Sequence, residues 1–166
     1  MTKLLSQAQL KCYERDGVLF PLQVLSPDDS SRFCAAFEDL ETRLGCPQQY
    51  VGLSHLFVRW AYDLATHPVV LDAVEDILGP DILVDGTLIL CKYPHDQSFL
   101  PWHQDGVYSG WHLTPSTSAW IALSDSTSEN GCMRVIPGSH RQRRLPHLAT
   151  HARRSLSCHG IGPLWR

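Results

Sequence analysis

The hydrophobic pattern of the chain changes near residue 80, from a helical period to an alternating one. In the first half, SPDD at residues 26–29 predicts a helix start, with a capping serine, a proline at the first helical position and acids that complement the helix dipole. An apolar face then recurs at helical spacing: Phe33, Phe37, Leu40 and Leu44. Gly45 predicts the end of this helix.

Two more helices are expected in the first 80 residues. Ser6 can cap a short helix that ends at Asp16-Gly17. The stretch THPVVLDAVEDILGP at residues 66–80 repeats the capped pattern, with a proline after the cap and a Gly-Pro terminator. Its apolar positions are Leu71, Val74 and Leu78. Between the first two helices, VLFPLQVL at 18–25 is typical of a strand, and its proline favours the edge of a sheet.

Alternation from residue 81 onward predicts strands. The candidates are DILVDGTLILCKY (81–93), STSAWIALS (116–124) and MRVIPGSH (133–140). Asn130-Gly131 lies between the last two and is a strong hairpin signal. Helices followed by antiparallel strands indicate an α+β fold whose second half is a sandwich or barrel. With no repeat or linker in 166 residues, we expect a single domain over 1–166.

Composition narrows the class of protein. Hydrophobic residues make up 43% of the chain and charged residues 19%, as in ordinary globular proteins, and the net charge of −3 indicates neither nucleic acid nor an anionic membrane as partner. No apolar run is long enough for a signal peptide or a membrane span. The six cysteines form no C-x-x-C pair, which argues against a structural zinc site. We therefore expect a cytoplasmic protein.

The candidate chemistry lies in PWHQDGVY at residues 101–108, where His103 and Asp105 are one residue apart. Residues two apart in a strand project to the same face, and imidazole nitrogen with carboxylate oxygen suits Fe(II). With 9 His and 17 acidic residues, however, about one such pair is expected by chance, so an ordinary polar strand end is the alternative. A catalytic iron would also need a third ligand.

The motifs surrounding this pair occur in a fixed order. They are LGPDILVDGTLILCKYP, PWHQDGVY, SAWIALSD and NGCMRVIPGSHR. In this order the motifs resemble the phytanoyl-CoA dioxygenase family of Fe(II)/2-oxoglutarate oxygenases. The resemblance implies N-terminal helices packed on a double-stranded β-helix (jelly-roll) core. It also implies hydroxylation of a small organic substrate with O2, coupled to decarboxylation of 2-oxoglutarate to succinate.

The resemblance also assigns roles to single residues. His103 and Asp105 match the family's first two iron ligands, and Trp120, Leu88 and Lys92 match positions around 2-oxoglutarate. Trp120 and Leu88 could equally be buried core residues of a sandwich. Trp102 and Tyr108 could either wall the substrate pocket or belong to the core.

The histidines near the end of the chain are candidates for the missing ligand. His140 matches a structural turn of the family, and His147 and His151 are expected on an exposed helix. The family's distal His ligand and its 2-oxoglutarate arginine lie further downstream. The chain is therefore interpreted as a C-terminally truncated member without its last strands. A catalytically silent homologue and a small-molecule-binding jelly roll remain the alternatives.

Overall fold

The structure is a computed structural model that describes residues 2–107, 115–142, 145–149 and 161–163. Its α-helices are α1 (Gln7–Asp16), α2 (Pro27–Leu44), α3 (Arg59–Ala65) and α4 (Pro68–Leu78), and its 3-10 turns are η1 (Ser54–Leu56), η2 (Asp105–Val107) and η3 (Ser139–Arg141). Its strands are β1 (Tyr50–Gly52), β2 (Leu88–Leu90), β3 (His147–Ala149) and β4 (Ile161–Pro163). The fold combines helices with small two-stranded sheets, which confirms the mixed class.

The capping signals placed the first two helices correctly. Ser6 and Gln9 form a capping box at the start of α1, in which the Ser6 hydroxyl accepts from the Gln9 backbone N–H and the Gln9 side chain accepts from that of Ser6. Ser26 caps α2 by accepting from the N–H of Asp29 at 3.1 Å. Gly17 and Gly45 end these helices in the left-handed conformation, with φ of 74° and 69°.

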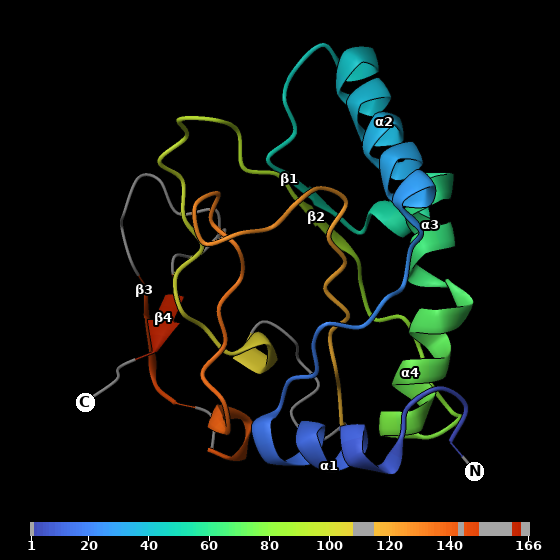
Figure 1. The fold of residues 1–166 in the computed structure, drawn as a ribbon. Helices are drawn as coiled ribbons and strands as arrows, with labels where there is room; N and C mark the ends of the chain where they lie inside the picture. The colour runs from blue at the N-terminus through green and yellow to red at the C-terminus, as the bar shows by residue number, and fades with distance from the viewer. Residues whose placement is uncertain (1, 108–114, 143–144, 150–160, 164–166) are drawn as a thin grey trace.

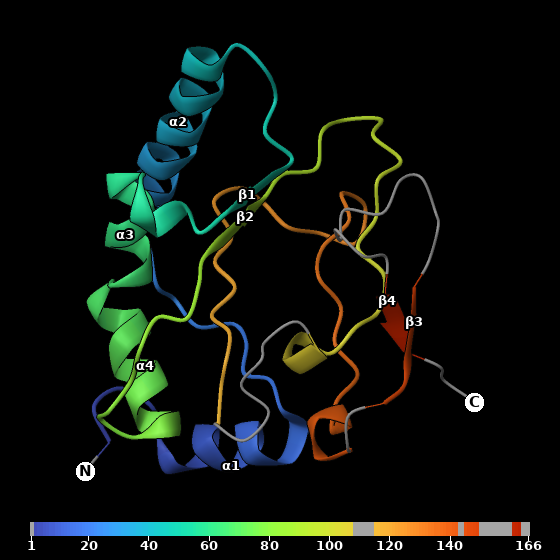
Figure 2. The same ribbon diagram turned by 180° about the vertical axis from the view of Figure 1, so that it is seen from behind.

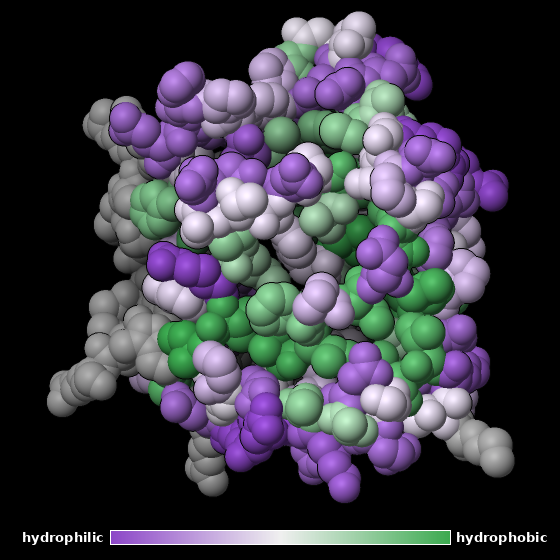
Figure 3. Space-filling model, viewed as in Figure 1, coloured by the Kyte–Doolittle hydropathy of each residue, from purple (hydrophilic) through white to green (hydrophobic). Residues whose placement is uncertain are grey.

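The helices carry most of the buried core. Figures 1 and 2 show their arrangement, and Figure 3 shows that hydrophobic residues also lie open at the surface across the middle of the face seen in Figure 1. Helices α2, α3 and α4 line one side of the molecule, and α1 runs across its lower end. The buried apolar side chains are Leu5, Leu25, Phe33, Phe37, Ala61, Val70 and Ala73. In α4 the most buried positions are thus Val70 and Ala73, whereas the predicted face of Leu71, Val74 and Leu78 is only half-buried. Among the described residues, no helix is long and apolar enough to cross a membrane.

Asp76 ties the N-terminal segment to α4. Its carboxylate accepts backbone N–H groups from Lys3 at 2.7 Å, Leu4 at 2.8 Å and Leu5 at 2.7 Å. These bonds hold the pKa of Asp76 below its usual value, the Leu5 bond contributing most. The contact fixes Leu5, which is almost fully buried, in the core.

The predicted strands were mostly wrong. Residues 18–25 form no strand, and of the segment 81–93 only Leu88–Leu90 is a strand, paired antiparallel with Tyr50–Gly52. Segment 116–124 is irregular, and segment 133–140 is irregular or turn until η3 begins at Ser139. Alternation shows only that a segment suits a sheet, whereas a strand also needs a partner to complete its hydrogen-bonded ladder.

Two details of the second half also differ from the prediction. Residues 128–131 do turn, with Gly131 at φ 82°, but the Asn130 side chain holds the turn by accepting from the N–H of Thr127 at 2.8 Å, and no strands flank it. His147 lies in β3, paired antiparallel with β4, and not on a helix. His151 and Tyr108 lie outside the described residues.

Candidate functional site

The structure brings His103 and Asp105 together. Nε2 of His103 lies 3.0 Å from Oδ1 of Asp105, and the side chains are 21% and 70% exposed. The expected strand is absent: residues 101–104 are irregular, and Asp105 begins the η2 turn. The two side chains meet because the chain turns directly after His103. Gln104, between them, accepts the backbone N–H of Leu145 at 2.8 Å.

The second ring nitrogen of His103 has a fixed partner. Nδ1 lies 2.7 Å from the carbonyl oxygen of Pro101. A carbonyl only accepts, so Nδ1 carries a hydrogen and donates it. In the neutral ring, Nε2 is therefore the nitrogen without a hydrogen, and it faces Asp105. This tautomer is the one in which Nε2 can bind a metal.

Hydrogen bonds also orient the carboxylate. The Ser118 hydroxyl donates to Oδ2 of Asp105 at 2.9 Å, on the oxygen that does not face His103. The hydrogen bond with His103, followed by that from Ser118, lowers the pKa of Asp105. In return, Asp105 and the Pro101 carbonyl raise the pKa of His103, with Asp105 the largest cause. Without a metal the pair thus favours a proton on Nε2, which a metal ion would have to displace.

The donor set fits a metal ion in part. Bonds of about 2.1 Å at a right angle put two neighbouring ligand atoms about 3 Å apart, close to the separation of Nε2 and Oδ1. Nitrogen and carboxylate oxygen are the donors of the 2-His-1-carboxylate iron sites. Within the described ranges, no group of three or more His, Cys, Asp or Glu side chains is arranged to hold a metal. These residues supply two donors.

Of the three residues expected around a co-substrate, Leu88 and Lys92 lie four residues apart and Trp120 lies on another segment. Leu88 begins β2 and is 46% exposed, and Trp120 is 51% exposed in the irregular segment that also carries Ser118. Neither is buried against the described residues, and both roles, co-substrate contact and core, stay predictions. The Lys92 ammonium donates to the carbonyl of Gly131.

Two residues near the His103–Asp105 pair could not be assigned from the sequence alone. Ser118 was not predicted as a site residue, because a serine two residues before a tryptophan carries no signal of its own. For Trp102 the sequence allows either a pocket wall or a core position. Trp102 is partly exposed, and the guanidinium of Arg134 lies 5.6 Å from its ring centroid, a cation–π contact.

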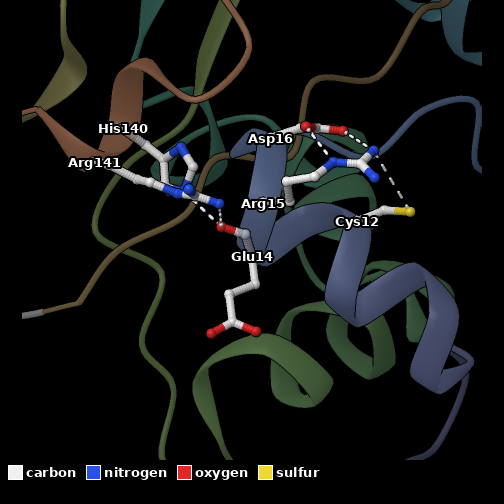
Figure 4. A network of polar contacts seen from close by, with 6 residues as sticks. All are labelled: Cys12, Glu14, Arg15, Asp16, His140 and Arg141. Atoms are coloured by element: carbon white, nitrogen blue, oxygen red, sulfur yellow. Dashed lines mark hydrogen bonds and ion pairs between the residues drawn. The ribbon is translucent and has the colours of Figure 1, made fainter.

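His140 lies in η3 and contacts α1, as Figure 4 shows. Its Nε2 lies 3.0 Å from the carbonyl oxygen of Glu14, and Arg141 donates to the same oxygen at 3.3 Å. The N–H of Gly138 donates to the carbonyl of Asp16 at 2.8 Å. His140 is thus a turn residue that satisfies the open end of a helix, as the sequence indicated.

Comparison with known proteins places these features in a family. The profile of the phytanoyl-CoA dioxygenase (PhyH) family matches residues 13–159. The chain is 35% identical to the human peroxisomal phytanoyl-CoA dioxygenase, with 87% of this chain and 50% of that protein covered. It is 24% identical to a probable phytanoyl-CoA dioxygenase of Caenorhabditis elegans, with 87% and 55% covered.

The name of a bacterial relative gives a different substrate. The ectoine dioxygenase of Streptomyces avermitilis is 26% identical over 82% of this chain and 52% of its own length. No solved structure matches the chain. The chain spans about half the length of the curated relatives it matches. With the family profile covering most of its residues, this chain belongs to the phytanoyl-CoA dioxygenase family of oxidoreductases.

Proposed function

We propose that this chain binds Fe(II) through His103 and Asp105 as part of a 2-oxoglutarate-dependent dioxygenase. The observation that carries the proposal is the 3.0 Å separation of Nε2 and Oδ1. Support comes from the Nδ1 contact with Pro101, which assigns Nε2 as the metal-binding nitrogen, and from membership of the family. A third ligand, needed for a facial iron site, completes the proposed centre.

The residues have distinct roles in this proposal. His103 and Asp105 hold the metal, while Trp120, Leu88 and Lys92 line the place of 2-oxoglutarate. Iron and 2-oxoglutarate, when bound, supply the oxidising chemistry that turns 2-oxoglutarate to succinate and hydroxylates a small organic substrate with O2. The protein fixes the ligand directions and the position of the co-substrate. Lys92 would exchange its contact with Gly131 for a carboxylate of 2-oxoglutarate.

The family also supplies the proposed architecture. We propose that residues 1–166 form one domain, in which the helices pack against a double-stranded β-helix core whose full set of strands is larger than the described one. The exposed apolar side chains of the second half of the chain, from residue 81 onward, fit that proposal, because the inner face of such a core is apolar. They include Leu88, Trp102, Trp120, Met133, Val135 and Ile136.

A turnover assay tests the proposal. The protein is supplied with Fe(II), 2-oxoglutarate and air, and succinate is measured for the native chain and for His103→Ala and Asp105→Ala. In a form of the protein that carries the third ligand, we expect succinate, and a loss to background in both variants. Asp63→Ala, which removes the exposed carboxylate paired with Arg59, should keep native turnover. Equal turnover in native protein and Asp105→Ala would refute the assignment.

A further inference from the structure

The carboxylate of Asp105 lies at the surface, so something must hold its direction. A side chain that is 70% exposed has little packing to restrict rotation about its two torsions. Two hydrogen bonds do restrict it, one on each oxygen: Oδ1 faces His103 and Oδ2 accepts from Ser118. The Ser118 bond therefore keeps the second oxygen occupied and aims the first at Nε2 of His103.

Ser118 lies on a segment that has few other anchors. Among the described residues, no backbone–backbone hydrogen bond involves residues 115–122. The Thr117 hydroxyl shares a hydrogen bond of 2.7 Å with the hydroxyl of Tyr13. Ser30 donates to the carbonyl of Leu123 at 2.9 Å, further along the segment.

Tyr13 belongs to the last turn of α1, the helix at the lower end of the molecule in Figure 1. In the same view, the segment that begins at residue 115 runs upward from α1, and η2 also lies above α1. Successive side chains of an extended chain point in opposite directions. Thr117 can therefore reach back to α1 while Ser118 reaches Asp105.

Helix α1 is itself firmly placed. Its start is fixed by the Ser6–Gln9 capping box. Its end accepts η3 through the carbonyl of Glu14, the contact drawn in Figure 4, and through the carbonyl of Asp16. Tyr13 is only partly exposed, and its hydroxyl bond to Thr117 is partly buried. Helix α1 is thus a well-anchored element to which Thr117 is hydrogen-bonded, and Ser118 is the next residue in the chain.

We propose that Ser118 is a positioning residue for Asp105 and that Tyr13 holds Ser118 in place through Thr117. The inference rests on the proposed function, since it gives the N-terminal helix a part in aiming a metal ligand. Partners that orient metal ligands typically contribute about 10–100-fold to metal affinity or activity. The neighbouring Trp120 shares the segment, so the same anchor would steady one wall of the co-substrate site.

The first measurement uses metal-free protein, so that it reads the His103–Asp105 contact directly. The ¹⁵N resonances of the His103 imidazole are compared at one pH in native protein, Ser118→Ala and Tyr13→Phe. We expect both variants to shift the Nε2 resonance, while the rest of the spectrum and the thermal midpoint stay close to native. Ser118→Thr and Thr117→Ser keep the hydroxyls and should retain the native resonance. Tyr62→Phe, a tyrosine of α3 exposed to solvent, is the matched control.

The second measurement is a titration with Mn²⁺, a redox-silent probe. Ser118→Ala should weaken binding by about 10–100-fold and Tyr13→Phe should weaken it less, while Ser118→Thr and Tyr62→Phe should not. An unchanged His103 resonance in Ser118→Ala would overturn the inference, as would native Mn²⁺ affinity in that variant. If the resonance shifts but native protein binds no Mn²⁺, the positioning role stands and the proposed metal function fails.

Discussion

Nε2 of His103 lies 3.0 Å from Oδ1 of Asp105, and the contact is made outside any strand. It pairs a nitrogen whose tautomer is set by the Pro101 carbonyl with an oxygen whose direction is set by Ser118. A carboxylate that is mainly exposed contributes little to packing, even with two hydrogen bonds. Its proposed role is therefore to bind a metal ion together with Nε2 of His103.

Asp105→Asn separates binding from folding. The amide keeps the shape of the carboxylate but loses its charge, so Mn²⁺ affinity should fall by more than about 100-fold, beyond the about 10–100-fold typical of outer partners. The free energy of unfolding should change by less than about 0.5 kcal/mol, because the side chain is exposed. Calorimetric titration and urea unfolding check the two parts. A loss of stability that matches the loss of binding would argue for a structural role.

Phe33 tests the helical core. It is 4% exposed, and its ring centroid lies 6.4 Å from that of Trp60. Phe33→Ala should destabilise the protein by about 3–5 kcal/mol, through lost burial and a cavity. Leu44→Ala, on the same helix but 54% exposed, is the control and should cost much less. Similar losses in both variants, measured by denaturant unfolding, would contradict the assignment of the core to this face of α2.

Asp76 should make the free energy of unfolding depend on pH in the acid range. Its folded pKa is lowered by the N–H groups of Leu5, Lys3 and Leu4, so its contribution is present above the unfolded value of about 3.9 and is lost as pH falls through the folded pKa. Asp76→Asn should be less stable at neutral pH, and the difference from native protein should shrink at low pH. Urea unfolding between neutral and acid pH measures it. A difference independent of pH would show that the charge is not involved.

Gly17 and Gly45 offer a matched pair. Both end helices with positive φ, but a Cβ on Gly17 would lie 2.2 Å from Nδ1 of His140, while one on Gly45 would meet nothing within 4 Å. Gly45→Ala should cost about 1–2 kcal/mol, the strain of the left-handed conformation. Gly17→Ala should cost more, because η3 must move away from α1.

The control removes the ring. In a His140→Ala background, Gly17→Ala should lose most of its extra cost over Gly45→Ala, because only the Cβ of residue 140 then remains close, at 3.0 Å. If Gly17→Ala and Gly45→Ala are equally mild in the native background, as measured by thermal and urea unfolding, η3 does not pack on α1 in the way described.

The helices were predictable because their signals are local. Ser6 with Gln9, Ser26 with Asp29, and the two terminal glycines act within a few residues, so the sequence alone locates α1 and α2. Strands depend on partners: β1 pairs with β2 across about forty residues, and the Tyr50–Gly52 segment showed no alternation that would reveal it. The alternating segments 116–124 and 133–140 lack ladder partners among the described residues.

The candidate site shows the same division. His103 and Asp105 could be named because they are neighbours in sequence and belong to an ordered set of motifs. The contact of Asp105 with Ser118 depends on the path of the chain, as does that of His140 with Glu14, 126 residues away. Such contacts come from tertiary structure, and no local pattern encodes them.

The most direct measurement of the account is an anaerobic titration of the protein with Fe(II) and 2-oxoglutarate, followed by visible absorption. Chelation of iron by 2-oxoglutarate at a protein site gives a metal-to-ligand charge-transfer band. The account predicts that, in a form of the protein that carries the third ligand, the band saturates at one iron per chain and is absent from His103→Ala and Asp105→Ala, with Asp63→Ala as native. A folded protein of that form that gives no band, or a band that survives loss of Asp105, would contradict it.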